Sequence, residues 1–419
     1  MKIVIATAVY YPMTNGVSVF SHNLAMGLAG RGHEVLVLCP SQTKKNYVRT
    51  EDGVKVHRLK SIDVKVYPDQ INDVPPKKKF LGITWPHLFY KKGFKVSVFP
   101  SKEIKRALDS FKPDVVHVQV SDPIGLSVVS YAKKKGIPVV TTEHNQPEVL
   151  TEPLKLPRPV RKPVNAMLYA YFRNRQSKSD FVTMPTKQAI DNLILSSGKE
   201  FNVPVAAVSN GVDLSNFKSG KAPKEIYEKY GISKDGLKVL YVGRVDPEKK
   251  VGMVIEAFKE ARKDLPNGTE MIVVGDGVDR LRLEKMVSEE GLGDSVKFLG
   301  RVLPPDLYEL YKIGDVFATA SEIETQGIVL IEAAATGLPL IAVNKGAVSE
   351  VCLTGENGYL CEPGNVKEIA KAMISILTDD ELRKKYSEGS VKIASEHDFE
   401  KTLDRFTNIY NKVQEKGGF

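Results

Sequence analysis

The chain has 419 residues, of which 42% are hydrophobic and 26% are charged, and its formal net charge is +9. This length predicts two or three domains, and the composition is that of a globular protein, which excludes collagen-like and wholly disordered chains. No window approaches the roughly 18 consecutive apolar residues that predict a membrane-spanning helix.

The first residues, Met1 to Ala6, lead directly into a strand-like segment without the charged and apolar regions of a secretory signal. The cysteines are only three and widely spaced, at Cys39, Cys352 and Cys361. This spacing predicts neither a disulfide framework nor a zinc site. We therefore expect a cytoplasmic protein.

Short runs rich in Val and Ile recur along the chain, with amphipathic helical stretches between them. Such runs are typical of buried parallel strands joined by crossover helices. A first series occupies residues 2–6, 34–39, 114–118 and 137–141, and a second occupies residues 237–243, 270–275, 296–300, 315–319 and 338–343. The pattern predicts an α/β protein with two Rossmann-like, doubly wound parallel-sheet domains.

We place the N-terminal domain at residues 1–204, the C-terminal domain at residues 205–394, and a last helix at residues 395–416 in the closing segment 395–419. Two such domains facing each other would set their ligand crevices, at the strand carboxyl ends, across one cleft. A single Rossmann dehydrogenase is the alternative, but no G-x-G-x-x-G fingerprint follows the first strand.

Charge is distributed unevenly between the two halves. Residues 1–200 hold 31 Lys and Arg against 16 Asp and Glu, whereas residues 201–419 hold 29 against 35. A basic half predicts contact with an anionic surface, either membrane headgroups or nucleic acid.

Two basic residues follow the strand at 237–243, in the loop Gly243-Arg244-x4-Lys249. Arg can hold phosphate oxygens with two hydrogen bonds, and Lys adds a point charge, so the pair suits a diphosphate ligand or leaving group. A solvated basic loop is the alternative interpretation.

Two acidic residues form the motif Glu324-x7-Glu332, and a helix is expected to begin near Gln326 or Gly327. Glu324 would then lie in the loop before the helix and Glu332 within it. The free amides at the helix N-terminus favour a phosphate, and the carboxylates can accept hydrogen bonds from sugar hydroxyls. An exposed or capping carboxylate is the alternative for either residue, although apolar neighbours around Glu332 indicate a buried side chain that requires partners.

These motifs, together with Gly275-Asp276-Gly277, Phe298-Leu299-Gly300-Arg301-Val302 and Gly337-Leu338-Pro339, resemble those of the family-4 retaining glycosyltransferases. The resemblance covers nearly the whole chain. It implies the GT-B fold, with a nucleotide-sugar held mainly by the C-terminal domain and an acceptor by the N-terminal one. It also implies that the last helix returns to the N-terminal domain.

The resemblance implies roles for individual residues of the C-terminal domain. Arg244 and Lys249 match the diphosphate clamp, Glu332 the carboxylate that holds the ribose hydroxyls, and Glu324 the one that contacts the donor sugar. The backbone amides around Gly327, Ile328 and Val329 are expected to bind phosphate oxygens, and the backbone at Arg301 and Val302 to meet the base.

Two positions of the N-terminal domain also match the family. His144 follows the strand at 137–141 and matches a histidine at the reacting sugar, whereas the residues alone leave a structural, hydrogen-bonded histidine open. Gly16 opens the first helix where the family has a pair of glycines near the phosphates, and here Asn15 replaces one of them.

Transfer with retention, as the resemblance implies, breaks the anomeric C–O bond and leaves negative charge on the diphosphate. Arg244, Lys249 and the helix amides are expected to stabilise that charge. In a front-face displacement the leaving phosphate accepts the proton of the acceptor hydroxyl, so no protein nucleophile is needed. No acidic ligand cluster occurs in these motifs, and we expect neither a metal nor another cofactor.

Basic and apolar side chains alternate in two stretches of the N-terminal half, residues 74–92 and 155–178. The second contains Lys155, Arg158, Arg161, Lys162, Arg173, Arg175 and Lys178 with Met167, Leu168, Tyr169, Tyr171 and Phe172 between them. This mixture suits an anionic lipid surface, and an ordinary surface helix is the alternative. No nucleic-acid-binding motif accompanies the charge, so no nucleic acid partner is expected.

The sequence around Glu324-Thr325-Gln326-Gly327 and His144 is similar to lipid-directed members of the family, especially diacylglycerol α-glucosyltransferases and then phosphatidylinositol mannosyltransferases. The leading hypothesis is a peripheral enzyme, on the inner face of the membrane, that transfers glucose from UDP-glucose to a lipid such as diacylglycerol. The alternatives are a GDP-mannose-dependent α-mannosyltransferase, a transferase to a soluble or polysaccharide acceptor, a nucleotide-sugar epimerase and a non-catalytic nucleotide-sugar-binding protein.

Overall fold

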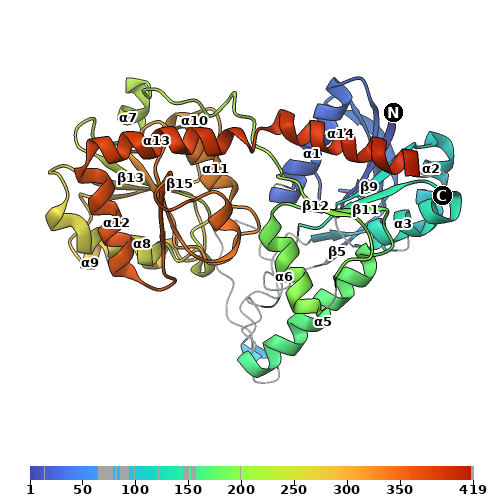
Figure 1. Ribbon diagram of the computed structural model, residues 1–419, viewed down its shortest axis with the longest axis horizontal. Coiled ribbons are helices and arrows are strands. Elements are labelled where there is room, and N and C mark those ends of the chain that lie inside the picture. Colours follow the sequence, from blue (N-terminus) through green and yellow to red (C-terminus); the bar gives the residue numbers. More distant parts are fainter. Residues whose placement is uncertain are drawn as a thin grey trace. The chain divides into compact units, whose positions relative to one another are not determined.

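The fold is described from a computed structural model (Figure 1). It describes residues 1–13, 15–64, 79–80, 83–84, 94–98, 100–119, 122–144, 151, 157–198 and 200–416. The described chain forms two compact units. Unit 1 contains the residues up to 210 together with 402–416, and unit 2 contains residues 211–401.

Unit 1 is built on an eight-stranded sheet with the order β12-β11-β10-β9-β1-β2-β4-β3, in which only β3 runs antiparallel to its neighbour. Its strands are β1 (Lys2–Ala6), β2 (Glu34–Pro40), β3 (Tyr47–Glu51), β4 (Val54–Leu59), β9 (Val115–Val118), β10 (Val139–Thr142), β11 (Phe181–Met184) and β12 (Val205–Ala207). Two short antiparallel pairs lie outside the sheet, β5 (Ile62–Val64) with β8 (Phe94–Val96) and β6 (Lys79–Phe80) with β7 (Ile83–Thr84).

The helices of unit 1 are α1 (Gly16–Gly30), α2 (Ser101–Phe111), α3 (Pro123–Lys135), α5 (Arg158–Gln176), α6 (Lys187–Ser197) and α14 (Phe399–Lys416), the last of which begins in unit 2. Apolar residues of α2 and α3 pack with Val4, Ala6, Leu36 and Leu38 of the central strands in one core cluster. The strand order reverses between β1 and β9. This is the switch point at which doubly wound sheets bind ligands, outside the strand carboxyl ends.

Unit 2 contains a six-stranded, wholly parallel sheet with the order β15-β14-β13-β16-β17-β18. Its strands are β13 (Lys238–Val242), β14 (Glu270–Val274), β15 (Val296–Gly300), β16 (Val316–Ala318), β17 (Leu340–Val343) and β18 (Gly358–Cys361). The helical elements are α7 (Lys224–Tyr230), η1 (Pro247–Lys249), α8 (Val251–Ala261), η2 (Arg262–Asp264), α9 (Arg280–Glu289), α10 (Asp306–Tyr311), α11 (Ile328–Ala335), η3 (Gly346–Glu350), α12 (Val366–Thr378) and α13 (Asp380–Ser395).

Both faces of this second sheet are covered, as the continuous apolar strands predict. Side chains of β13 alternate between two cores: Val239 and Tyr241 pack with α8 and α12, whereas Leu240 and Val242 pack with α10 and α11. The order reverses between β13 and β16, so the loops after these two strands define the switch point of unit 2.

The division of the chain differs from the expected one at both places where it crosses between units. Residues of β12 pair in parallel with β11, so unit 1 extends to Asn210 rather than to residue 204. The helix expected over 395–416 begins later, because Ser395 is the last residue of α13 and α14 begins at Phe399. Phe399 N–H donates to Val212 O at 3.0 Å, which ties the start of α14 to unit 2.

The remainder of α14 packs against unit 1, alongside α1 (Figure 1). The Phe406 ring lies 5.9 Å from that of Phe20 on α1, and Arg31 Nη1 lies 2.7 Å from Asp404. Tyr410 Oη lies 2.7 Å from His117 Nδ1, whose Nε2 lies 2.7 Å from Thr142 Oγ1. The last helix is therefore bound to the centre of the first sheet by buried aromatic and polar contacts.

Candidate functional site

The loops after β13 and β14 approach each other closely in unit 2, and glycines make this possible. A Cβ atom at Gly275 would lie 1.7 Å from Gly243 O, and one at Gly277 would lie 2.3 Å from Val245 O. Val245 N–H donates to Asp276 O at 2.9 Å. The glycines of the predicted motifs thus hold the backbone of the Arg244 loop in place.

Arg244 follows β13 directly and is half exposed, with a side-chain exposure of 42%. Its guanidinium contacts Asp246 through Nη1, and Nη2 lies 2.8 Å from Glu248 Oε1. Tyr241 Oη donates a hydrogen bond to the Arg244 carbonyl oxygen at 2.7 Å, which holds the backbone of this loop in position. The guanidinium is therefore accessible to solvent, although two carboxylates of its own loop, Asp246 and Glu248, hold it in position.

Lys249 ends the short helix η1, and Glu324 lies in the loop after β16. Lys249 Nζ lies 2.6 Å from Glu324 Oε1, and each side chain is only 16% exposed. The structure therefore joins two of the predicted residues from either side of the switch point in one largely buried ion pair.

A second ion cluster lies beside this pair and was not predicted from the sequence. Glu322 contacts Lys250 and lies 2.5 Å from Lys345 Nζ. The two ammonium groups hold the pKa of the Glu322 carboxyl below its usual value, although its burial alone would raise it. The loop between β16 and α11 is thus fixed by two successive carboxylate–lysine contacts.

The helix expected near Gln326 begins at Ile328, with Gly327 as the residue before it. Gly327 has φ +75°, a left-handed conformation that favours glycine. Leu330 N–H donates to Gly327 O at 2.9 Å, whereas the amides of Ile328 and Val329 precede the hydrogen-bonded turn. The start of α11 therefore offers free N–H groups to an anion.

Glu332 lies in the second turn of α11 and is partly buried. Tyr311 Oη donates to Glu332 Oε2 at 2.6 Å. Burial raises the pKa of the Glu332 carboxyl to about 7, although the Tyr311 hydrogen bond acts in the opposite direction. Among the hydrogen bonds of the described residues, none involves the other oxygen of this carboxyl, Oε1.

Arg301 and Val302 follow β15 in the same sheet. Arg301 is exposed, and Val302 packs against the core cluster that also contains α11. Among the described contacts, none joins Arg301 to the Lys249–Glu324 pair. The contact expected between the base of the nucleotide and the backbone at Arg301 and Val302 therefore stays a prediction.

His144 lies just beyond the end of β10 in unit 1 and is buried. Its Nε2 lies 2.8 Å from Gln119 Oε1, so we assign the proton to Nε2, which donates to the amide oxygen. Its ring lies 5.2 Å from that of Phe20. Burial lowers the pKa of His144 to about 3, so the imidazole is neutral at physiological pH.

Gly16 opens α1, as expected, and Asn15 caps the helix. Asn15 Oδ1 accepts from Ser18 N–H at 2.9 Å, and Asn15 N–H donates to Ser18 Oγ at 2.9 Å. Gly16 is exposed, and a Cβ there would meet no atom within 4 Å. Phe20, one turn further along α1, is the residue of this helix whose ring lies beside His144.

Two residues of the site were missed by sequence reasoning. Gln119 follows β9 at the switch point of unit 1, so its position after a predicted strand was a usable signal. Tyr311 is the last residue of α10. It is distant from Glu332 in the sequence, and no motif indicates that the two side chains meet.

No group of three His, Cys, Asp or Glu side chains within the ranges given above could hold a metal ion. No helix in the described part of the chain has the length and apolar character needed to cross a bilayer.

Comparisons with known proteins identify the class. A solved structure of Anabaena HepE in complex with UDP superimposes with a TM-score of 0.71 at 17% identity, covering 98% of this chain and 100% of that one. The fold is therefore the GT-B fold of two Rossmann-like domains.

The family follows from the sequence comparisons. Residues 14–216 match the model of Glycosyltransferase Family 4, and residues 223–392 match that of Glycosyl transferases group 1. The chain therefore belongs to the family-4 glycosyltransferases, as its motifs predict, and is a nucleotide-sugar-dependent hexosyltransferase.

Two curated relatives are similar over most of their length. An alpha-monoglucosyldiacylglycerol synthase from Acholeplasma laidlawii is 29% identical over 389 residues, which are 91% of this chain and 89% of the relative. A GDP-mannose-dependent alpha-mannosyltransferase from Mycobacterium tuberculosis is 26% identical over 387 residues, with the same coverage of both chains.

Proposed function

We propose that this enzyme transfers glucose from UDP-glucose to a membrane lipid such as diacylglycerol, with retention of the anomeric configuration. The observation that carries the proposal is the arrangement after β13 and β16. Lys249 and Glu324 meet there at 2.6 Å, next to the free amides at the start of α11. Cations, carboxylates and amides at one switch point are what a sugar diphosphate requires.

The diphosphate is assigned to the basic groups and the helix amides. Arg244 and Lys249 neutralise phosphate oxygens, and the amides around Ile328 and Val329 donate hydrogen bonds to them. The negative charge on the diphosphate grows as the anomeric bond breaks, so these groups bind the transition state more strongly than the ground state. Fixed donors of this kind often make the largest contribution to rate enhancement.

The two carboxylates are assigned to hydroxyl groups. Glu332 Oε1 accepts from the ribose while Tyr311 holds Oε2, and Glu324 accepts from the donor sugar. His144 keeps the role at the reacting sugar that the family resemblance implies. Because its pKa is lowered to about 3, the imidazole acts there as a neutral hydrogen-bonding group.

The transfer itself is a front-face displacement. The bond from the anomeric carbon to the leaving phosphate oxygen breaks, and a bond from that carbon to the acceptor oxygen forms on the same face. The acceptor hydroxyl gives its proton to the leaving phosphate. No covalent intermediate on the protein is required, and the nucleoside diphosphate of the donor is the leaving group.

The lipid acceptor is supported by one surface and by the relatives. Helix α5 has no acidic residue, and its apolar residues divide between two sides: Tyr169 and Phe172 are buried, whereas Met167 is 64% exposed. We call the exposed residues Val160, Lys162, Met167 and Tyr171, with the partly exposed Arg161, the α5 surface. Each cation near an anionic leaflet contributes about 1 kcal/mol. Alpha-monoglucosyldiacylglycerol synthases are among the similar curated proteins.

The first of the two basic stretches, residues 74–92, lies outside the described residues apart from β6 and β7. The proposed peripheral location, on the inner face of the membrane, therefore relies on the α5 surface.

A second candidate is transfer of mannose from GDP-mannose. The 26% identity to a GDP-mannose-dependent alpha-mannosyltransferase over 91% of the chain favours it. Arg244, Lys249 and the α11 amides fit either sugar diphosphate equally. The difference between the two donors is confined to the base and one hydroxyl configuration of the sugar.

The deciding experiment incubates the enzyme separately with UDP-glucose and GDP-mannose, each with diacylglycerol, with total lipid extract and without acceptor. Mass spectrometry identifies the product, and NMR of the anomeric proton gives its configuration. An α-linked glucosyl lipid formed only from UDP-glucose is expected. A mannosyl product selects the second candidate, whereas donor turnover without an acceptor contradicts the lipid transferase and indicates an epimerase or hydrolase.

A further inference from the structure

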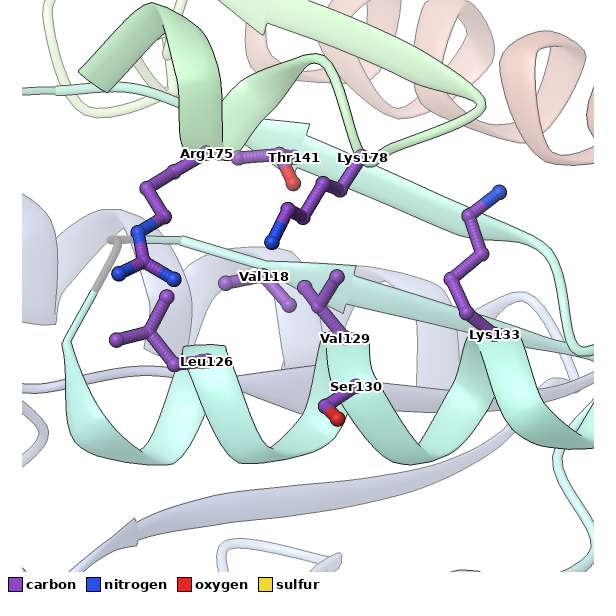
Figure 2. Close-up of a pocket in the computed structure, with 9 residues that line it drawn as sticks. Val118, Leu126, Val129, Ser130, Lys133, Thr141, Arg175 and Lys178 are labelled. Atoms are coloured by element: carbon purple, nitrogen blue, oxygen red, sulfur yellow. The ribbon is translucent and has the colours of Figure 1, made fainter. Parts of the chain in front are cut away.

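A pocket of about 440 Å³ lies in unit 1, between α3, the C-terminal end of α5 and the sheet. Figure 2 shows its lining. Val118 of β9 and Thr141 of β10 line its floor, α3 contributes Leu126 and Val129, and the basic residues are Lys133, Arg175 and Lys178. The candidate donor-binding residues belong to unit 2 except Gly16, and Gly16 does not line this pocket.

Two of the basic side chains have no acidic partner in the described part of the chain. Lys133 Nζ is paired with Asp180 Oδ1 at 2.5 Å, whereas neither Arg175 nor Lys178 forms an ion pair there. The Arg175 guanidinium lies 5.1 Å from the centroid of the Tyr171 ring, which restricts its position. In Figure 2, Arg175 and Lys178 extend from the end of α5 towards α3, above Val118 and Leu126.

One atom in this arrangement is an exception to ordinary hydrogen bonding. Arg175 Nε is buried and has no hydrogen-bond partner. Buried polar atoms are almost always hydrogen-bonded, and a charged donor left unpaired is costly. Arg175 is partly buried and Lys178 is exposed, and two like charges at one cavity with an unused donor suit an anionic ligand.

The floor restricts the chemistry of that anion. Val118 and Thr141 are buried, and Thr141 Oγ1 is already hydrogen-bonded to Ser179 Oγ at 2.6 Å. The floor therefore offers mainly apolar contact, and the basic groups without an acidic partner, Arg175 and Lys178, lie together at the end of α5. A volume of this size exceeds what an inorganic ion needs and lies within the range of small-molecule sites. A guanidinium beside an ammonium suits phosphate oxygens.

We infer that this pocket is a second ligand site of the enzyme, which binds a phosphate ester with its anionic group on Arg175 and Lys178 and its carbon chain on the Val118 floor. The inference does not depend on which donor or acceptor the enzyme uses. The ester is either a free metabolite or the headgroup of an anionic lipid, since both present the same group.

The site also lies next to the catalytic candidates of unit 1. Val118 is followed by Gln119, whose amide oxygen accepts from His144, and Thr141 precedes His144 by three positions. Alternate residues of a strand point to opposite faces, so Thr142 contacts His117 while Thr141 lines the pocket. An occupied pocket therefore contacts the two strand ends that hold His144.

The test measures binding to the full-length protein by calorimetry, with glycerol 3-phosphate as the free ester. A parallel sedimentation assay uses vesicles of phosphatidylglycerol in phosphatidylcholine. Arg175→Gln and Lys178→Gln each remove one charge, and Ser130→Trp fills the pocket without changing its charge. Lys134→Gln is the matched control, because it removes an exposed charge from α3 next to Lys133 without lining the pocket.

We expect saturable binding with one site, weakened about tenfold or more in Arg175→Gln and Lys178→Gln, lost in Ser130→Trp and unchanged in Lys134→Gln. Binding of glycerol 3-phosphate assigns the site to a free ester. The same variant pattern seen only with vesicles assigns it to a lipid headgroup. Thermal unfolding of each variant verifies that it is folded.

Three results would overturn the inference. They are no saturable binding of either probe, equal binding by the wild type and Ser130→Trp, and an equal loss in Lys134→Gln, which would reveal general charge attraction.

Discussion

Lys249 Nζ lies 2.6 Å from Glu324 Oε1, so the cation expected to neutralise a diphosphate is already paired with the carboxylate expected to contact the sugar. Both side chains are 16% exposed, and such a pair is screened less by salt than a surface pair. A donor must therefore share Lys249 with Glu324 or take it over. Removal of either partner leaves the other charge uncompensated in a largely buried place.

The first prediction concerns Lys249→Ala. We expect kcat to fall about 100-fold, because the charge on the leaving diphosphate loses a fixed cation. We also expect a loss of about 1–3 kcal/mol in the free energy of unfolding, because Glu324 is left without its partner. Steady-state kinetics and urea unfolding measure the two effects separately.

A second substitution separates the catalytic effect from the structural one. The double variant Lys249→Ala, Glu324→Gln should recover much of the lost stability while turnover stays low. Lys259→Ala is the control, because Lys259 pairs with Glu290 at 3.2 Å on the surface of the same unit. Wild-type turnover in Lys249→Ala would remove the diphosphate role.

The second prediction concerns pH and Glu332. Its pKa is raised to about 7 in the folded protein, above the ordinary value of 4.5, so the folded state binds a proton that the unfolded state has released. Ionisation of Glu332 therefore costs stability as the pH rises from about 4.5 to 7. Only the ionised carboxylate accepts hydrogen bonds with both oxygens. We expect the affinity for UDP-glucose to increase between pH 6 and 8.

Glu332→Gln should abolish this pH dependence and weaken donor binding at pH 8. The same variant should gain stability relative to the wild type above pH 7, by about 1–3 kcal/mol, because no charge remains to be desolvated. Calorimetric titration with the intact sugar nucleotide measures the affinity, and urea unfolding at each pH measures the stability. A wild-type affinity that is flat with pH would contradict the assignment.

The third prediction concerns the contact between Gln119 and His144. The Gln119 Oε1 atom accepts from His144 Nε2 at 2.8 Å and thereby sets the tautomer and the orientation of the ring. We expect Gln119→Leu to lower kcat about tenfold, by release of this orientation, with little change in donor affinity. Gln188→Leu makes the same chemical change on α6, away from His144, and serves as the control.

A second variant at Gln119 tests the contact with the His144 ring by adding a negative charge beside it. Gln119→Glu places a carboxylate next to His144 and should raise the pKa of the imidazole well above the value of about 3 that burial produces. The imidazole protons of His144 report this change in an NMR titration. If the pKa of His144 does not move in Gln119→Glu, the contact has no part in orienting the ring.

The strand pattern was predictable because the strands of both sheets are continuous apolar runs. Every strand expected from the sequence is present, with ends that differ by a residue or two. The other strands of the two sheets escaped: β3 is exposed along most of its length, β12 has three residues, and β4, β11 and β18 include Lys, Arg, Thr or Gly among their apolar residues. Pairing with neighbours, rather than composition, makes these segments strands.

The interruption before α14 was not predictable for a similar reason. Residues 396–398 continue the polar character of α13, and no Pro or Gly marks the end of that helix. Backbone contacts between Val212 and the residues His397 and Phe399 replace the helical ones there. Such a contact joins parts of the chain that are distant in the sequence, so no local pattern reveals it.

The positions of the candidate site residues were predictable to the extent that motifs carried them, whereas their roles stay predictions. Arg244, Lys249, Glu324 and Glu332 occupy loops and helix starts at the strand carboxyl ends. The motifs did not show that Lys249 pairs with Glu324, or that Tyr311 donates a hydrogen bond to Glu332. Both depend on which strands become neighbours, and the reversal of order at β13 and β16 decides that.

The last prediction concerns Gly327, which determines how α11 begins. Its φ of +75° is strained for any other residue, and a Cβ atom would lie 2.7 Å from Leu330 Cδ1. We expect Gly327→Ala to weaken UDP-glucose binding at least about tenfold, because the Ile328 and Val329 amides turn away from the phosphate. Gly364→Ala is the matched control, since Gly364 has φ +86° with no atom within 4 Å of the added Cβ. Both variants should lose about 1 kcal/mol of stability from the backbone strain alone, so equal donor binding by the two would show that the amides at the start of α11 do not hold the diphosphate.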